Sequence, residues 1–200
     1  MKRFYVGLAG VIGAGKSTVA VMIRDCLAES LIEAEIRSFA DGVRQSLLAI
    51  DPLVNSDSGE TIRLGRLIKT IGWDRAKREW PEVRRLLRAV GTEGGRDIHG
   101  EDCWIRREAE GATRDVVVFD DMRFPNELEF VNGRGISIWV EKKDFLSGGV
   151  TDSHRSESYH ELLKSRCTFL VTNDFDDTAK VWKRVREIAE LIVQKAKGRK

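Results

Sequence analysis

Residues 10–18 read Gly10-Val11-Ile12-Gly13-Ala14-Gly15-Lys16-Ser17-Thr18, which fits the pattern G-x-x-x-x-G-K-[ST] of a phosphate-binding loop. The preceding residues, Phe4 to Ala9, are short and apolar, as in a buried strand. The following apolar residues have the spacing of one helix face: Val19, Met22, Ile23, Cys26 and Leu27. A strand, a glycine-rich turn and a helix are the context in which this pattern binds phosphate, which argues against a chance glycine-rich turn.

The chemistry of such a loop follows from its residue types. Glycines let the backbone curl so that successive N–H groups point at phosphate oxygens, and the helix start adds about half a positive charge. Lys16 can reach the β- and γ-phosphates, and the Ser17 hydroxyl can ligate Mg²⁺. We therefore predict that ATP and Mg²⁺ are bound through Gly10, Ile12, Gly13, Ala14, Gly15, Lys16, Ser17 and Thr18.

Composition is that of an ordinary globular chain: 200 residues, 42% hydrophobic and 33% charged, with a net charge of +2. This length suits one sizeable domain. There is no long apolar run and no signal-peptide pattern, so we expect a cytoplasmic protein without a membrane partner, in the host cytoplasm if it is viral. Three widely spaced cysteines, Cys26, Cys103 and Cys167, indicate a reducing compartment and no disulfide or metal role.

Basic residues are concentrated between Arg63 and Arg88, where they outnumber the acids Asp74, Glu79 and Glu82. Such a stretch is either a solvated helical face or an anion-binding flank for a nucleotide or nucleic acid. Charge alone does not separate the two.

Strand-like and helix-like segments alternate along the chain. Further strands are predicted at 34–39, 116–119, 136–140 and 168–172, and helices at 42–90 (with a turn-rich break at 51–59) and 126–131. A last helix is predicted with one apolar face, followed by a basic tail at 195–200; that face comprises Val181, Val185, Ile188, Leu191 and Ile192. This alternation predicts an α/β fold with a parallel sheet covered on both faces and a ligand site at the carboxyl ends of its strands.

Charged residues follow two of these strands. Asp41 and Arg44, three residues apart on a new helix, can face one pocket, although Asp41 is equally suited to be a helix N-cap. Asp120 and Asp121 follow an apolar strand, where an acid can hold Mg²⁺ directly or through water, and Arg123 beside them could stabilise a phosphoryl group in transfer. The alternative for this second group is a solvated turn with a helix cap.

Two other polar segments are candidates. The stretch 87–105 carries polar side chains among glycines, including Thr92, Glu93 and Arg96, and suits either the rim of a base or sugar pocket or a surface loop. After the last strand, Asn173 and Asp174 either belong to a site or cap the final helix.

The chain resembles bacteriophage deoxynucleoside monophosphate (dNMP) kinases from about residue 4 to about residue 190. Beside the phosphate loop, the motifs that carry the resemblance are Phe39-Ala40-Asp41, Gly91-Thr92-Glu93 with Arg96 and Trp104, Asp121-x-Arg123-Phe124-x-Asn126-Glu127, and His154-x-Ser156-Glu157. The resemblance implies a P-loop kinase fold with a five-stranded parallel core, an NMP-binding helical insert at about 42–110 and a lid at about 141–159. It also implies transfer of phosphate from ATP to a dNMP, and places Asn173-Asp174 beside the adenine.

Direct transfer between two polyanions requires a lysine, Mg²⁺ and arginines rather than covalent chemistry. The catalytic candidates are Lys16, Arg123, Asp121, Arg44 and Asp41, and the metal candidates are Ser17 and Asp121. The register of the resembling motif favours Asp121, but the acid is doubled here, so Asp120 remains an alternative. The substrate candidates are Phe39, Ala40, Asp41, Arg44, Thr92, Glu93, Arg96, Trp104 and Arg155, and Lys142, Lys143 and Arg155 could close over the phosphates.

Two other functions stay open. A dephospho-coenzyme A kinase would share the fold and the Asn-Asp turn, but the segments at 91–93 and 123–127 argue against it. A nucleic-acid-binding ATPase would use the basic stretch at 63–88. An N-K-x-D segment is missing from the sequence, which argues against a GTPase. The partners expected are ATP and a dNMP of undetermined base, with nucleic acid disfavoured and a homodimer left open.

Overall fold

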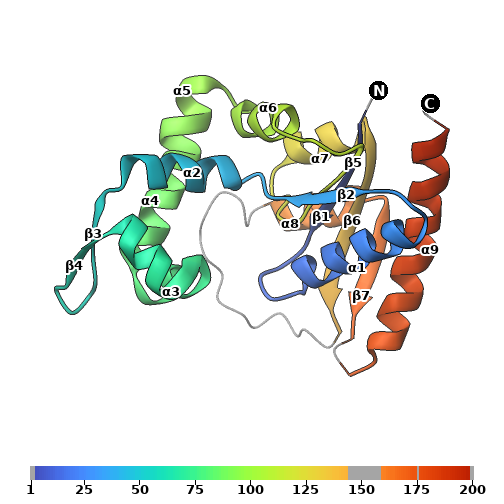
Figure 1. Cartoon of the computed structure of the whole chain (residues 1–200), viewed down its shortest axis with the longest axis horizontal. Helices are drawn as coiled ribbons and strands as arrows, with labels where there is room; N and C mark the ends of the chain where they lie inside the picture. Colours follow the sequence, from blue (N-terminus) through green and yellow to red (C-terminus); the bar gives the residue numbers. More distant parts are fainter. Residues whose placement is uncertain (1–2, 144–158, 175, 199–200) are drawn as a thin grey trace. The chain divides into compact units, whose positions relative to one another are not determined.

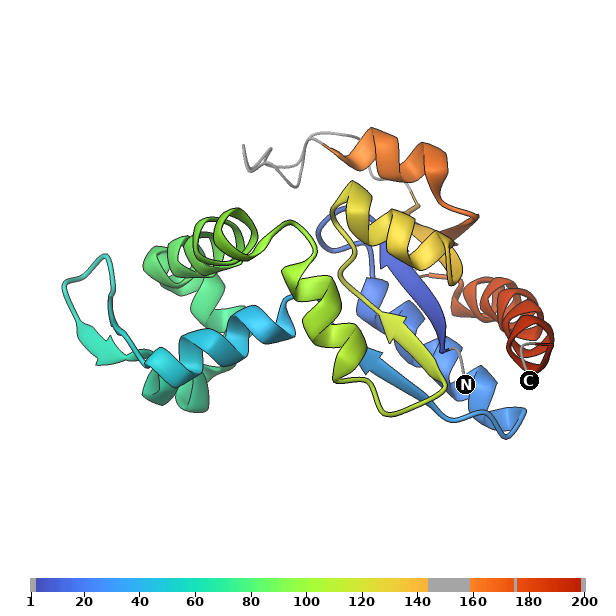
Figure 2. The same ribbon diagram turned by 90° about the horizontal axis from the view of Figure 1, so that it is seen from above.

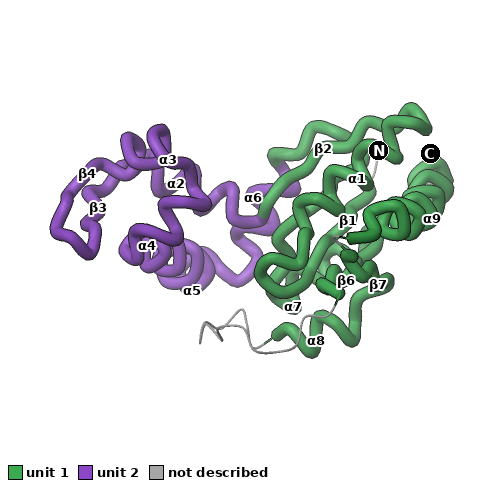
Figure 3. Tube along the Cα trace, turned by 90° about the horizontal axis from the view of Figure 1, so that it is seen from below, with its two compact units in different colours: residues 1–38, 111–200 green, residues 39–110 purple. Residues whose placement is uncertain are grey.

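The computed structural model describes residues 3–143, 159–174 and 176–198. The chain divides into two compact units, which Figure 3 distinguishes by colour. Unit 1 consists of Met1–Ser38 and Gly111–Lys200, and unit 2 of Phe39–Glu110. Unit 2 therefore covers nearly the same residues as the helical insert expected from the sequence.

Unit 1 is built on a parallel sheet with the strand order β2-β5-β1-β6-β7. Its strands are β1 (Phe4–Ala9), β2 (Ala34–Arg37), β5 (Val116–Phe119), β6 (Gly135–Lys142) and β7 (Phe169–Asn173). β1 and β5 are buried along their whole length, as their uninterrupted apolar sequences predict. The predicted α/β class and five-stranded parallel sheet are confirmed.

Helices cover both faces of this sheet, as Figures 1 and 2 show for unit 1. One face packs against α1 (Lys16–Glu29) and α9 (Thr178–Lys197), because every second strand residue, such as Val6 and Leu8, points into their shared core. The other face meets α7 (Pro125–Asn132) and α8 (His160–Arg166). No helix in the described part of the chain has the length and apolar character needed to cross a membrane.

Four details of unit 1 differ from the prediction. The second strand ends at Arg37 instead of residue 39, and the last helix continues to Lys197 instead of giving way to a tail at 195. Leu191 is 37% exposed, so it lies at the margin of the apolar face of α9 rather than within it. The short helix α8 was not predicted.

Unit 2 is mainly helical and contains one hairpin. Its elements are α2 (Asp41–Ile50), β3 (Leu53–Asn55), β4 (Thr61–Arg63), α3 (Leu64–Glu79), α4 (Pro81–Gly91), the π-helical turn η1 (Thr92–Arg96), α5 (Asp97–His99) and α6 (Cys103–Glu110). A separate apolar core holds it together, formed by Leu47, Val54, Leu64, Leu67, Ala76, Trp80 and Val83.

Two predictions for unit 2 are wrong in part. The expected turn at 51–59 belongs to the antiparallel hairpin of β3 and β4. The segment 87–105, expected to be a pocket rim or a surface loop, is largely helical, so the surface-loop alternative is wrong, while Gly95 and Trp104 do line a pocket. Trp104 donates a hydrogen bond of 2.8 Å to the carbonyl of Gly91 and so joins α6 to the end of α4.

Candidate active site

The phosphate loop leaves the carboxyl end of β1, the middle strand of the sheet, and leads into α1 at Lys16. Its first glycine is required by the packing: a Cβ on Gly10 would lie 2.1 Å from the carbonyl oxygen of Val140 in β6. The first N–H groups of α1 have no acceptor within the helix and are placed to bind an anion. The loop therefore has the backbone geometry that its sequence predicts.

Lys16 spans the loop from the first turn of α1. Its ammonium donates hydrogen bonds of 2.7 Å to the Gly10 carbonyl and 2.9 Å to the Val11 carbonyl. The ammonium thus lies against the loop backbone, where its hydrogen bonds can pass from the carbonyl oxygens to phosphate oxygens.

Ser17 meets the carboxyl end of a neighbouring strand. Its hydroxyl donates a hydrogen bond of 2.8 Å to the carboxylate of Asp120, which directly follows β5. A hydroxyl and a carboxylate in contact are the oxygen ligands that Mg²⁺ takes in nucleotide sites, usually together with waters and phosphate oxygens. Ser17 is thus in contact with Asp120, the alternative metal ligand, rather than with Asp121, the one predicted from motif register.

Asp121, the aspartate favoured by motif register, has a different partner. Its carboxylate accepts a hydrogen bond of 2.5 Å from the hydroxyl of Ser38, a buried residue just beyond β2. The assignment of the metal to Asp121 stays a prediction, but the contact with Ser17 favours Asp120. Asp121 instead joins the ends of two neighbouring strands.

Arg123 is exposed, while its backbone is firmly held. The buried carboxylate of Glu127 accepts hydrogen bonds from the backbone N–H of Arg123, at 2.6 Å, and of Phe124, at 3.0 Å. Glu127 thereby closes the first turn of α7, as an acid at the third helical position does. The two hydrogen bonds therefore hold the backbone at Arg123 against the start of α7.

Asn173, at the end of β7, is 4% exposed and donates a hydrogen bond of 2.9 Å to the carbonyl of Ala14 in the phosphate loop. The N-cap of α9 is Asp177, whose side chain accepts from the backbone N–H of Lys180 at 3.1 Å. The alternative that Asn173 or Asp174 caps this helix is therefore wrong.

Asp174 pairs with Lys143 across the ends of β7 and β6. The ammonium of Lys143 lies 2.6 Å from the carboxylate, and the hydrogen bond that it donates lowers the pKa of Asp174 below its usual value. Lys143, expected to belong to a lid, is thus tied to the sheet edge next to Asn173. Of that lid, residues 144–158 lie outside the described part of the chain, and with them Arg155 and the motif from His154 to Glu157.

The acceptor candidates belong to unit 2. Arg44 and Asp41 form an ion pair of 2.8 Å on α2 with both side chains about one-third exposed, and Asp41 is the first residue of the helix instead of its N-cap. An exposed pair of this kind contributes about 0–1 kcal/mol. Arg44 can therefore exchange its partner for a ligand phosphate at small cost.

Arg96 and Trp104 have structural contacts in the same unit. Arg96 is 4% exposed and donates a hydrogen bond of 2.7 Å to the carbonyl of Glu101. Trp104 is bonded to Gly91, as described above. Phe39 is also buried, Glu93 is exposed, and Ala40 and Thr92 are half-buried. The roles of these residues toward a substrate stay predictions.

The described residues contain no cluster of three or more His, Cys, Asp and Glu side chains able to hold a metal ion. The three cysteines are free. Burial raises the pKa of the Cys167 thiol to about 11, so this thiol is protonated and unreactive at neutral pH.

No protein-family model matches the chain, and no curated protein matches it. Similar solved structures include shikimate kinases. That from Bacteroides thetaiotaomicron is 14% identical, with a TM-score of 0.47 over 94% of this chain and 97% of that chain. That from Aquifex aeolicus is 13% identical, with a TM-score of 0.44 over 96% of each chain. That from Acinetobacter baumannii, in complex with shikimate, is 13% identical, with a TM-score of 0.42 over 96% of this chain and 94% of that chain. Because these values are low, the fold class rests on the sheet and the phosphate loop themselves.

Sequence reasoning missed Ser38 and gave no role to Glu127. Ser38 could have been found as a polar residue at the carboxyl end of a predicted strand, where ligand sites of parallel sheets form. Glu127 could have been found from the sequence Phe124-Pro125-Asn126-Glu127, since a proline at the first and an acid at the third helical position signal a helix start.

Proposed function

We propose that the protein is an ATP-dependent, Mg²⁺-dependent kinase that converts deoxynucleoside monophosphates to diphosphates and so supplies precursors for DNA synthesis, such as that of a phage. The contact of 2.8 Å between Ser17 and Asp120, directly beside the phosphate loop, is the observation that carries the donor half of this proposal. The acceptor half is supported by the motifs that resemble dNMP kinases and by the partly exposed Asp41–Arg44 pair.

On the donor side, the loop backbone and Lys16 hold the β- and γ-phosphates of ATP. The ammonium of Lys16 is already held at the loop by its hydrogen bonds to the carbonyl oxygens of Gly10 and Val11. Little reorganisation is therefore needed when phosphate oxygens take the place of these carbonyl oxygens. Asn173 fixes the loop through Ala14 from the other side.

Ser17 and Asp120 would hold Mg²⁺, Ser17 directly and Asp120 directly or through water. The fit is chemical: both are oxygen donors, and their contact is short enough for a shared ion or its water shell. When bound, the ion neutralises charge on the phosphates. Asp121 acts indirectly, since its bond to Ser38 fixes the strand end from which Asp120 projects.

On the acceptor side, an oxygen of the dNMP phosphate attacks the γ-phosphorus, the bond from that phosphorus to the β–γ bridging oxygen breaks, and ADP leaves. Arg44 binds the dNMP phosphate, since a guanidinium binds phosphate bidentately and stays charged at any working pH. Arg123 stabilises the charge on the transferred group, from a backbone that Glu127 holds in place.

The proposal is tested by measuring ADP release with each of the four dNMPs, dephospho-coenzyme A, shikimate and single-stranded DNA as separate acceptors. We expect at least one dNMP to raise ADP release about tenfold or more above the rate with ATP alone. If only dephospho-coenzyme A or shikimate stimulated ADP release, that compound and not a dNMP would be the acceptor. If DNA stimulated ADP release and the effect fell steeply with salt, the protein would be a nucleic-acid-dependent ATPase.

A further inference from the structure

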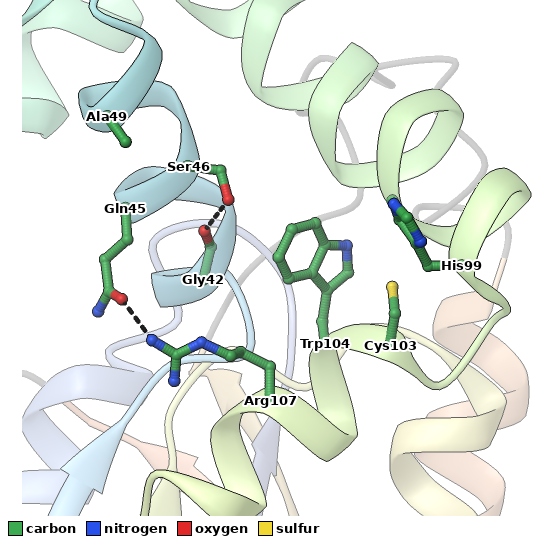
Figure 4. A pocket seen from close by; sticks show the side chains of 9 residues that line it. Gly42, Gln45, Ser46, Ala49, His99, Cys103, Trp104 and Arg107 are labelled. Carbon is green, nitrogen blue, oxygen red and sulfur yellow. Dashed lines mark hydrogen bonds between the residues drawn. The ribbon is translucent and has the colours of Figure 1, made fainter.

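A cavity of about 370 Å³ lies within unit 2. It is lined by one face of α2, by η1 and α5, and by the start of α6, and Figure 4 shows its side chains. The residues that line it are Gly42, Gln45, Ser46, Ala49, Gly95, His99, Cys103, Trp104 and Arg107. Its volume is at the small end of the range for ligand pockets, about 300–1,000 Å³, and suits a molecule of one or two rings.

The wall is largely apolar, and Trp104 lies in its middle (Figure 4). A Cβ on Gly42 would lie 2.8 Å from the indole ring and a Cβ on Gly95 would lie 2.6 Å from it, so both backbones touch the ring and neither position tolerates a side chain. On α2 the residues next in the wall are small, Ser46 and Ala49. The cavity therefore offers aromatic and backbone surface to a planar ligand.

The polar side chains that line the cavity lie around this wall, and each is either positively charged or uncharged. Among the described lining residues, Arg107 has the one full charge at neutral pH, and its guanidinium donates a hydrogen bond of 2.8 Å to Gln45. A guanidinium has five N–H donors, so further donors can bind an anion. His99 adds an imidazole on the other side of the indole, and burial raises the pKa of the neighbouring Cys103 thiol, which keeps it neutral.

Trp104 in the cavity wall is one of the substrate candidates, but the proposed phosphate-binding residue Arg44 and its partner Asp41 do not line the cavity. Gly42, Gln45, Ser46 and Ala49 share one face of α2, because positions three, four and seven apart align on a helix. Asp41 and Arg44 each precede a cavity residue by one position, which turns them about 100° around the helix axis. A ligand in the cavity and a phosphate on Arg44 therefore use different faces of α2.

We propose that this cavity is a second ligand site, which takes a planar aromatic or heteroaromatic molecule with one anionic group. The ring packs beside Trp104 and against the glycine and alanine surface, and the anion pairs with Arg107. The site does not depend on the proposed kinase activity, since binding can be measured without any nucleotide.

The test is an NMR titration of the whole ¹⁵N-labelled protein with 2-naphthoate and, as a neutral molecule of matched shape, 2-naphthamide. We expect saturable shifts of the Trp104 indole N–H and of the Gly95 and His99 amides, with naphthoate bound at least about fivefold more tightly than naphthamide. Lack of saturable shifts at these signals up to about 5 mM naphthoate overturns the proposal, as does equal affinity for the two probes.

Variants assign the binding to the cavity. Arg107→Gln should bring the naphthoate affinity to within about twofold of the naphthamide affinity, and Ala49→Phe, which fills the cavity from the exposed side of α2, should remove the saturable shifts with both probes. Arg78→Gln removes a comparable exposed charge elsewhere in unit 2 and should change neither affinity. Shifts that persist in Ala49→Phe place the binding elsewhere and contradict the proposal.

Discussion

The side-chain amide of Asn173 donates a hydrogen bond of 2.9 Å to the carbonyl oxygen of Ala14, and this joins the end of the last strand to the phosphate loop. Both residues are buried. Resemblance to nucleotide kinases places Asn173 beside the adenine of ATP, but this contact ties its side chain to the loop that holds the phosphates.

The first prediction follows from that contact. Asn173→Ala leaves the buried Ala14 carbonyl without this donor, at a cost of about 1–3 kcal/mol. The affinities for ATP, GTP and inorganic tripolyphosphate should therefore fall by the same factor, about fivefold or more, as measured by calorimetric titration. Thr172→Ala, an exposed neighbour in β7, is the control. If ATP affinity fell while tripolyphosphate affinity stayed at the wild-type value, Asn173 would be reading the base.

The second prediction distinguishes the two aspartates after β5. Asp120→Asn should lower the Mg²⁺-dependent turnover by about 10²–10³-fold, because Asp120 is the residue in contact with Ser17. Asp121→Asn should cost less in turnover, since it weakens the bond to Ser38 instead of the metal site. Turnover measured against Mg²⁺ concentration decides the question, and a larger loss in Asp121→Asn would restore the assignment made from motif register.

The third prediction concerns the acceptor. Arg44→Ala should raise the KM for the dNMP at least about tenfold and leave the KM for ATP nearly unchanged, because the proposed role of Arg44 is to bind the acceptor phosphate alone. The measurement is steady-state kinetics with each substrate varied in turn. Equal effects on the two KM values would refute this role.

Arg96 is the contrasting residue for this prediction. The sequence suggests that Arg96 also binds the dNMP, but it is buried and bonded to Glu101. Arg96→Ala should therefore lower the free energy of unfolding by about 2 kcal/mol, measured by urea denaturation, whereas Arg44→Ala should change it by less than about 1 kcal/mol.

The fourth prediction concerns the pH dependence of stability. The hydrogen bond from Lys143 lowers the pKa of Asp174 in the folded state below its usual value of 3.8. Because the folded-state pKa is the lower one, the stabilisation is complete at pH values above the unfolded pKa and is lost as the pH falls through the folded pKa. The stability difference between wild type and Asp174→Asn should thus be constant from pH 7 to about pH 5 and shrink below about pH 4. A difference that grew toward acid pH would contradict the sign.

Elements with long or strongly apolar patterns could be predicted from the sequence. Val116 to Phe119 is apolar throughout and forms a strand buried on both faces, and the spacing from Val19 to Leu27 gives the buried face of α1. The hairpin strands Leu53–Asn55 and Thr61–Arg63 are three residues long each, too short for an alternating pattern to show.

The helical structure of the segment after α4 was missed for another reason. Its glycines suggested a pocket rim or a surface loop, whereas Gly95 is a glycine because the Trp104 ring lies 2.6 Å from where its Cβ would be. That contact joins residues of different helices, and propensity within a short window does not contain it. The choice between Asp120 and Asp121 depended in the same way on which side of the strand end each one faces.

The transfer reaction itself is the most direct test of the central claim. The protein is incubated with [γ-³²P]ATP, Mg²⁺ and a dNMP, and the labelled products are separated and identified. A kinase transfers the label to the dNMP, so we predict labelled dNDP with the wild type and almost none with Lys16→Met, whose circular dichroism and urea denaturation should match the wild type. Label found in inorganic phosphate alone, or dNDP formed at the wild-type rate by Lys16→Met, would contradict the proposal.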